Sequence, residues 1–230
     1  MNFFNTQEPI LRRKQVHLDV QDLTGLLHWH WQIGQRTLIS WLYTRIDQVF
    51  LLWGWITGLI FLTPQFFPAV SWADQAVLWT VLSVAGAAVM IGLAWFWVTV
   101  ERLRWLIYLW CELVIGGVAL TDYGIFAGSG LILANLCALW LTLCGIGYAT
   151  MGLGMRSRTF LVIAGLHAAA LPLLDAVPAY QFLVTAMVMS GSLFALAELQ
   201  WDMRPPSESK VLSEAQNTFN FQQQNLRASS

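Results

Sequence analysis

The sequence has few charged residues. Only 11% of its 230 side chains are Asp, Glu, Lys or Arg, against about 25% in soluble domains. Its apolar residues, 57% of the total, gather in long runs that a water-soluble core does not need. This composition predicts an integral membrane protein. The net charge of −1 gives no reason to expect a nucleic-acid partner.

Motifs for catalysis, cofactors and metals are also missing. The sequence contains no P-loop, HExxH, GxSxG or dinucleotide-binding fingerprint. Its three cysteines, Cys111, Cys137 and Cys144, lie inside apolar runs without a CxxC pair, which favours helix packing over a disulfide or a metal site. We therefore expect no enzyme activity, no catalytic residues, no metal and no cofactor.

What the sequence does contain is six apolar runs of transmembrane length. About 20 helical residues cross the hydrocarbon core of a bilayer, and a helix satisfies all of its backbone hydrogen bonds within lipid. A transmembrane β-barrel would instead show alternating strands of about ten residues. The runs predict an all-α integral membrane protein whose six transmembrane helices span 49–67, 76–100, 105–126, 131–155, 159–180 and 182–201.

The short connections between these runs carry basic residues on one side of the membrane only. Residues 101–104 and 156–158 contain arginines, whereas 71–74, 127–129 and 175–180 contain neither lysine nor arginine. Because basic loops stay in the cytoplasm, both termini are predicted to be cytoplasmic. We expect a multi-pass protein of a cell membrane of the cytoplasmic or inner type, surrounded by membrane lipid.

Residues 1–48 are predicted to form a cytoplasmic segment, and two structures are open for its middle part. Apolar and polar residues alternate over 16–21 and over 27–33, on either side of a turn-like 22–25. This alternation is typical of a β-hairpin. An interfacial amphipathic helix, with its tryptophans at headgroup depth, fits the same residues. Residues 36–48 carry apolar side chains at helical spacing and predict a short amphipathic helix before the first span.

The C-terminal residues differ in composition from the rest of the chain. Residues 203–230 contain Pro205-Pro206, many serines, glutamines and asparagines, and few apolar side chains. Such a composition cannot bury enough surface to fold by itself. The expected organisation is therefore a cytoplasmic segment over 1–48, a transmembrane domain over 49–202 and a disordered cytoplasmic tail over 203–230.

Glu112 is the most prominent candidate for a functional residue. It lies about eight residues from the cytoplasmic end of the third span, or about 12 Å deep. A charged side chain at a helix centre costs about 2.5–3.5 kcal/mol and needs a partner. His167, at similar depth in the fifth span, is the partner that we expect. Such a pair could relay a proton or contact a solute, and a carboxyl that only ties helices together is the simpler alternative. One histidine does not argue for haem.

Three further polar residues inside the spans are candidates for the same site. Tyr108 shares the helix face of Glu112. Asn135 and Thr142 belong to a stripe of small residues in the fourth span that also contains Gly145. Small residues let helix backbones approach closely, and a buried Asn or Thr adds a hydrogen bond between helices.

Asp122 and Asp175 lie at matching depths near the outer boundary of the membrane. They could form an acidic vestibule for a cation, or they mark where helices meet the interface. On the cytoplasmic side, His28 and His30 would share one face of a hairpin with His17 across from them. No cysteine or carboxylate completes a ligand set there, so no metal site is predicted.

Two functions fit these features. The first is a small solute or ion permease, or a channel-like protein, that acts as a homo-oligomer and uses the polar residues at membrane depth. The alternative is a non-catalytic assembly or accessory subunit of a larger membrane complex. The many aromatic residues and the absence of catalytic motifs support this second function.

Overall fold

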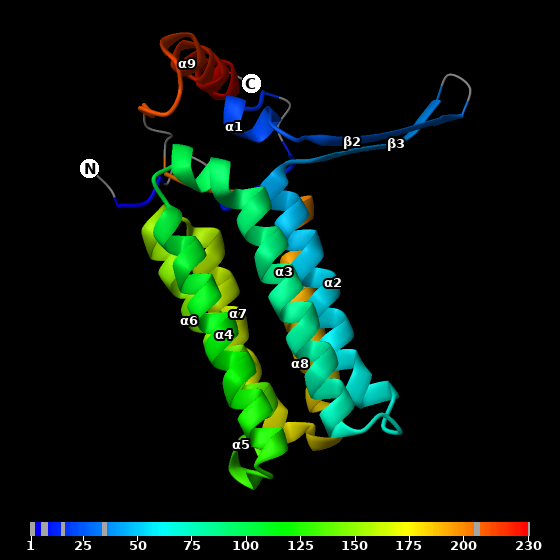
Figure 1. Ribbon diagram of the computed structural model, residues 1–230. Helices are drawn as coiled ribbons and strands as arrows, with labels where there is room; N and C mark the ends of the chain where they lie inside the picture. Colours follow the sequence, from blue (N-terminus) through cyan, green and yellow to red (C-terminus); the bar gives the residue numbers. More distant parts are fainter. Residues whose placement is uncertain (1–2, 6–8, 15–16, 34–35, 205–207, 230) are drawn as a thin grey trace.

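The main body of the protein is a bundle of long helices. The computed structural model describes residues 3–5, 9–14, 17–33, 36–204 and 208–229. Six helices in this part of the chain are long and apolar enough to cross a membrane, which confirms the predicted all-α bundle (Figure 1). They are α2 (Arg45–Phe66), α3 (Trp72–Val100), α4 (Arg104–Phe126), α6 (Leu136–Met155), α7 (Arg158–Ala176) and α8 (Gln181–Glu198).

These six helices form a closed ring in the order α2, α3, α4, α6, α7, α8 and back to α2. In Figure 1, helices α2, α3 and α8 stand on one side and α4, α6 and α7 on the other. Part of the predicted stripe of small residues, at Gly145 and Gly152 of α6, packs against α7, whereas Thr142 of the same stripe is exposed. A Cβ atom added to Gly152 would lie 2.9 Å from the side chain of Leu161 and 3.0 Å from its backbone nitrogen. Glycine there permits the close approach of the two helices.

A capping box sets the start of α2, four residues before the predicted run. Thr44 Oγ1 accepts a hydrogen bond from the Asp47 backbone N–H at 3.2 Å. The Asp47 carboxylate accepts one from the Thr44 N–H at 2.8 Å. These two bonds satisfy backbone donors that a helix start leaves without an intrahelical partner.

The predicted fourth span is broken near its N-terminal end. A short helix α5 (Gly130–Ala134) is separated from α6 by Asn135. The Asn135 side-chain amide donates to the Leu131 carbonyl oxygen at 2.8 Å. A local side-chain bond of this kind competes with regular helix hydrogen bonding, and hydropathy does not reveal it.

The terminal segments lie outside the ring at one of its ends (Figure 1), and we call the described residues of 9–26, 199–204 and 208–229 the cap. Within the cap, β1 (Leu11–Arg12) pairs antiparallel with β4 (Gln200–Trp201). The short helix α1 (Val20–Leu23) lies beside the C-terminal helix α9 (Glu214–Ser229), as Figure 1 shows. Both ends of the chain therefore lie at the same end of the bundle.

A β-hairpin is present, but its pairing differs from the predicted one. Strand β2 (Leu27–Ile33) pairs with β3 (Arg36–Tyr43), and the hairpin projects away from the bundle in Figure 1. The expectation that 16–21 forms the partner strand is wrong for its described residues, since α1 and the residues before it lie outside the ladder. His28 pairs with Leu42, so the arrangement with His17 across the hairpin is also wrong.

The predicted amphipathic helix over 36–48 is wrong as far as Tyr43. Its apolar positions Leu38, Leu42 and Ile46 are four residues apart, and this interval fits the two-residue period of a strand as well as a helix. The segment is rich in β-branched and aromatic residues, which favour a strand.

A disordered tail is predicted over 203–230. The structure differs from this prediction at Glu214–Ser229, which form the helix α9. Helix α9 docks through a few polar residues and not through a broad apolar face. The Asn220 side chain accepts a hydrogen bond from the Val20 backbone N–H at 2.8 Å and donates to Gln21 at 3.0 Å. Composition alone misses such pairs, because their partners are about 200 residues away in the chain.

Candidate functional site

The ring encloses an apolar cavity of about 120 Å³. All six long helices contribute side chains to its wall, together with Trp201 of β4. The wall is almost entirely apolar, and no lysine, arginine, aspartate or glutamate of the described chain lines it. Large residues from different helices make up most of it, including Phe50, Trp97, Trp110, Tyr148 and Met189.

His167 is the most polar residue of this wall. Its side chain is fully buried, and its ring lies 5.1 Å from the ring of Tyr148, centroid to centroid. His167 Nδ1 lies 2.9 Å from the Ile163 carbonyl oxygen. A carbonyl only accepts, so in neutral His167 the proton sits on Nδ1 and the lone pair on Nε2. No described residue forms a hydrogen bond with His167 Nε2.

Trp53 provides a second polar atom of this kind. It lines the same cavity from α2, and its buried Nε1–H has no hydrogen-bond acceptor among the described residues. Two other tryptophans of the wall do have partners. Trp140 donates to Thr121 Oγ1 at 3.1 Å, and Trp97 donates to Asp22 Oδ1 at 3.1 Å. Trp53 therefore differs from them in having a free donor.

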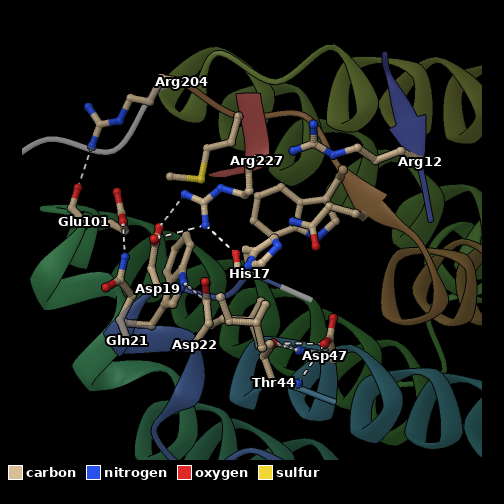
Figure 2. A pocket seen from close by; sticks show the side chains of 16 residues that line it. Arg12, His17, Asp19, Gln21, Asp22, Thr44, Asp47, Glu101, Arg204 and Arg227 are labelled. Atoms are coloured by element: carbon tan, nitrogen blue, oxygen red, sulfur yellow. Dashed lines mark hydrogen bonds and ion pairs between the residues drawn. The ribbon is translucent and has the colours of Figure 1, made fainter. Parts of the chain in front are cut away.

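A second cavity of about 120 Å³, which we call the polar chamber, lies between the bundle and the cap (Figure 2). It shares three wall residues, Ile46, Trp97 and Trp201, with the apolar cavity. The rings of Trp97 and Trp201 pack edge to face with their centroids 6.2 Å apart. These shared residues therefore separate a polar compartment from an apolar one.

Acidic side chains of the cap and of the α3–α4 connection gather at the polar chamber. Burial, followed by the nearby Asp19 carboxylate, raises the pKa of Asp22 from 3.8 to about 7, although the hydrogen bond from Trp97 acts in the opposite direction. Burial also raises the pKa of Glu101, which accepts a hydrogen bond from Gln21 at 3.0 Å. Asp22 is therefore partly protonated near neutral pH.

Arg227 of α9 provides positive charge at this chamber. Its two terminal nitrogens donate to the two carboxylate oxygens of Asp19 at 3.0 and 3.1 Å, and Nη1 also donates to the His17 carbonyl at 2.7 Å. Figure 2 shows Arg227 reaching across to Asp19 and His17, which precede α1. Both partners of the ion pair are largely buried, so it fixes the C-terminal helix over the chamber.

Asp202 closes the cap on its other side, at the start of α7. Its carboxylate is buried and accepts hydrogen bonds from the Thr159 backbone N–H at 2.9 Å, from Ser157 Oγ at 3.0 Å and from Arg158 Nε at 2.8 Å. Burial alone would raise the pKa of Asp202, but these bonds and the other contacts with Arg158 and Thr159 keep it below its ordinary value. Asp202 thus caps α7 with a negative charge at the positive end of the helix.

The structure does not bring Glu112 and His167 together. Glu112 lies on the outward face of α4 and makes no hydrogen bond or ion pair with a described residue, whereas His167 faces the interior. Tyr108, Asn135 and Thr142 are also exposed on the outside of the bundle. Of the five polar candidates inside the spans, His167 is the one that reaches the cavity.

The acidic candidates of the outer boundary are separate as well. Asp122 accepts a hydrogen bond from Thr80 Oγ1 of α3 at 2.9 Å. Asp175 is exposed near the end of α7. No hydrogen bond joins them in the part of the chain that the structure describes, and no cavity found there is lined by both.

Sequence reasoning did not single out Trp53, Asp22, Glu101 or Asp202. Trp53 resembles the other tryptophans of the spans, and nothing local shows that its N–H lacks a partner. The acidic residues lie at span ends or in the N-terminal segment, where a carboxylate needs no special explanation. One signal was available, since Asp202 directly follows the last apolar run.

Within the described residues, no three His, Cys, Asp or Glu side chains are placed to hold a metal ion. No protein-family model, curated protein or solved structure matches the chain. The apolar cavity and the polar chamber are therefore the observations from which a function can be inferred.

Proposed function

We propose that the protein is a multi-pass protein of a cell membrane, with both termini in the cytoplasm, that binds a small and mostly apolar molecule inside its helix bundle. The apolar cavity is the observation that carries this proposal. It is enclosed by all six long helices and holds His167 and Trp53 with polar atoms that lack partners. An apolar cavity of about 150 Å³ is known to bind benzene, so a molecule of similar size fits here.

The charge distribution supports the cytoplasmic position of the cap. All twelve Lys and Arg residues belong to segments at the cap end, including Arg227, which α9 brings back to the bundle. The opposite end carries Asp74, Asp122 and Asp175 and no basic residue. Because basic flanks remain inside, the cap is assigned to the cytoplasm. A tag on either terminus that reports from the outside would contradict this topology.

The chemistry of the cavity favours an apolar ligand over an ion. An ion in a nearly apolar cavity would lose its hydration without gaining charged or carbonyl ligands. Glu112, the carboxylate expected to line a pathway, faces outward. The permease predicted from the sequence stays a prediction, and it would require Trp97 and Trp201 to move apart so that the cavity opens into the polar chamber.

Binding is tested with 4-fluorotoluene and the full-length protein in lipid nanodiscs, followed by ¹⁹F NMR. We expect a bound resonance that empty nanodiscs do not show. Ala94→Leu adds a larger side chain to the cavity wall and should abolish this resonance. Ala119→Leu places the same side chain on the exposed face of α4 and should leave it unchanged. Equal signals from protein-loaded and empty nanodiscs would overturn the proposal.

A specific observation favours the accessory subunit as a second candidate. Glu112 lies between Tyr108 and Tyr123, which are 55% and 62% exposed, on the outward face of α4. A Cβ atom added to Gly116 on this face would meet nothing within 4 Å. A carboxylate that faces lipid is costly, so a partner helix that hydrogen-bonds Glu112 would stabilise both proteins.

Gentle detergent extraction tests this second candidate. We expect a membrane partner to copurify in fixed stoichiometry with the wild type and to be lost from Glu112→Leu. Asp175→Leu is the matched control, because it removes an exposed carboxylate near the outer boundary. If the wild type purifies without any partner, the accessory function is excluded.

A further inference from the structure

Two residues that line the apolar cavity carry buried polar atoms of opposite hydrogen-bonding character. His167 Nε2 offers a lone pair, and Trp53 Nε1 offers a proton. Both residues line the same cavity. We infer that the bound molecule is an apolar compound with a hydroxyl group, which donates to His167 Nε2, while Trp53 Nε1 donates to an oxygen of the same molecule. This inference rests on the proposed binding function.

The acceptor character of His167 follows from its local geometry. The Ile163 carbonyl lies one helical turn before His167 and 2.9 Å from Nδ1, so it fixes the ring orientation and places the proton on Nδ1. His167 is fully buried. Its ring lies against the ring of Tyr148, and its Cβ would lie 3.5 Å from a Cβ atom added to Gly145 of α6. A buried acceptor without a donor costs free energy, and a ligand with an O–H group removes that cost.

Several other polar groups of the wall already have hydrogen-bond partners. Thr57 Oγ1 lies 2.8 Å from the Trp53 carbonyl oxygen and 3.1 Å from Ser190 Oγ. Trp97 and Trp140 both have acceptors for their N–H groups. Among the buried polar side-chain atoms of this wall, His167 Nε2 and Trp53 Nε1 are the ones without a hydrogen-bond partner among the described residues.

Only some functional groups meet both requirements. A carbonyl or ether oxygen can accept from Trp53 but cannot donate to His167. An ammonium group donates but does not accept, and a carboxylate accepts but does not donate. Either ion would also lose its hydration in an apolar cavity. A hydroxyl group is neutral, donates once and accepts through its lone pairs, so a phenol or a small apolar alcohol fits best.

The experiment compares two probes of nearly equal size, 4-fluorophenol and 4-fluorotoluene. Each is titrated into nanodiscs that contain the full-length protein, with empty nanodiscs as the reference for partitioning into lipid. We expect the wild type to bind 4-fluorophenol about tenfold more tightly than 4-fluorotoluene, since a buried polar group without a partner is costly. The hydroxyl group is the relevant difference between the probes.

Two variants each remove one of the two groups invoked here and keep an aromatic ring; His167→Phe also removes Nδ1, which among the described residues bonds only to the Ile163 carbonyl. His167→Phe and Trp53→Phe should each reduce the preference for the phenol to less than about threefold, while 4-fluorotoluene still binds. Trp79→Phe is the matched control, because its buried N–H also has no acceptor among the described residues but Trp79 does not line the cavity, and it should keep the full preference. Retained binding of 4-fluorotoluene also shows that each variant is folded.

The outcomes separate this inference from the proposed function. If both probes bind the wild type equally well, the hydroxyl inference is overturned and the binding function stands; a cavity whose polar atoms are satisfied by water alone would give this result. If neither probe binds, the binding function itself fails. A phenol preference that survives both His167→Phe and Trp53→Phe would also overturn the inference.

Discussion

The bundle and the cap bury different kinds of side chain. The core of the bundle near the cap is formed by apolar residues such as Phe50, Leu106 and Phe160, which meet across helices of the ring. The cap instead buries charged and amide groups in pairs. The members of one pair, Asp19 and Arg227, are separated by 208 residues in the sequence. Similar burial is thus achieved by nonspecific packing in one region and by individual polar contacts in the other.

This difference has an energetic consequence. An apolar side chain in the bundle can be exchanged for another of similar volume at small cost. A buried charge in the cap cannot lose its partner without leaving an uncompensated charge or unsatisfied donors behind. Single substitutions should therefore be more damaging in the cap than in the bundle, and four predictions test this contrast.

The largest effect is expected at Asp202. Asp202→Ala leaves the Ser157 hydroxyl and the Thr159 backbone N–H without their acceptor and removes the ion pair with Arg158, which should lower the free energy of unfolding by about 3–5 kcal/mol. Asp175→Ala, an exposed aspartate near the other end of α7, should change it by less than about 0.5 kcal/mol. Unfolding in SDS, followed by circular dichroism, measures both. Equal effects would remove the distinction between cap and exposed carboxylates.

The next effect concerns the docking of α9. Arg227→Ala leaves Asp19 buried without its ion-pair partner and should weaken docking by about 3 kcal/mol. We expect faster hydrogen exchange across Glu214–Ser229 and no change in α6 or α7. Lys210→Ala, at an exposed position nearby, is the control. Unchanged exchange in Arg227→Ala would mean that other contacts hold α9.

A smaller effect is expected in the bundle. Gly152→Ala forces its new Cβ against Leu161 and should destabilise the protein by about 1–3 kcal/mol. Gly116→Ala adds the same atom where nothing lies within 4 Å and should be neutral or slightly stabilising, because alanine is the better helix former. Thermal unfolding in detergent compares the two. A loss in Gly116→Ala as large as in Gly152→Ala would show that helix packing is not the cause.

The last prediction is a pH dependence of the cap. The pKa of Asp22 is about 7 in the folded protein and ordinarily 3.8. Between these two pH values, Asp22 therefore keeps its proton in the docked cap and releases it when the cap undocks. Docking should therefore weaken as the pH rises from about 4 to 7, by at most about 1.4 kcal/mol per pH unit. Glu101, whose pKa is also raised, adds to this slope.

Asp22→Asn keeps an acceptor for Trp97 and removes the titration. Hydrogen exchange of α9 in this variant should depend less on pH than in the wild type, and comparing the two proteins at each pH cancels the intrinsic pH dependence of exchange. Asp19 and Arg227 also face this group, so the variant is compared at constant ionic strength. Parallel pH profiles for both proteins would exclude Asp22 as the titrating group.

The sequence was most informative where local pattern decides the structure. Hydropathy located all six long helices, and the small residues of the fourth span correctly indicated a close helix contact, seen at Gly152. Pattern failed for residues 36–43, because an interval of four residues suits a strand and a helix alike. It also failed for α9, whose docking depends on Arg227 and Asn220 meeting partners from the other end of the chain.

The candidate site shows the same division. Depth along a helix can be counted from the sequence, so Glu112 and His167 were both recognised as polar residues inside the spans. The direction in which each side chain points depends on how its helix is rotated against its neighbours. In the structure, this rotation leaves Glu112 on the outside and buries His167.

The sequence by itself determined six helices of membrane length and the segregation of basic residues to one end, because both follow from the local pattern of hydropathy and charge. Only the tertiary structure decided which helices are neighbours, which polar atoms lack partners in the cavity, and how the cap closes over the bundle. These features depend on contacts between residues far apart in the chain. Their energies are set by burial and by hydrogen-bond geometry, which a linear pattern does not contain.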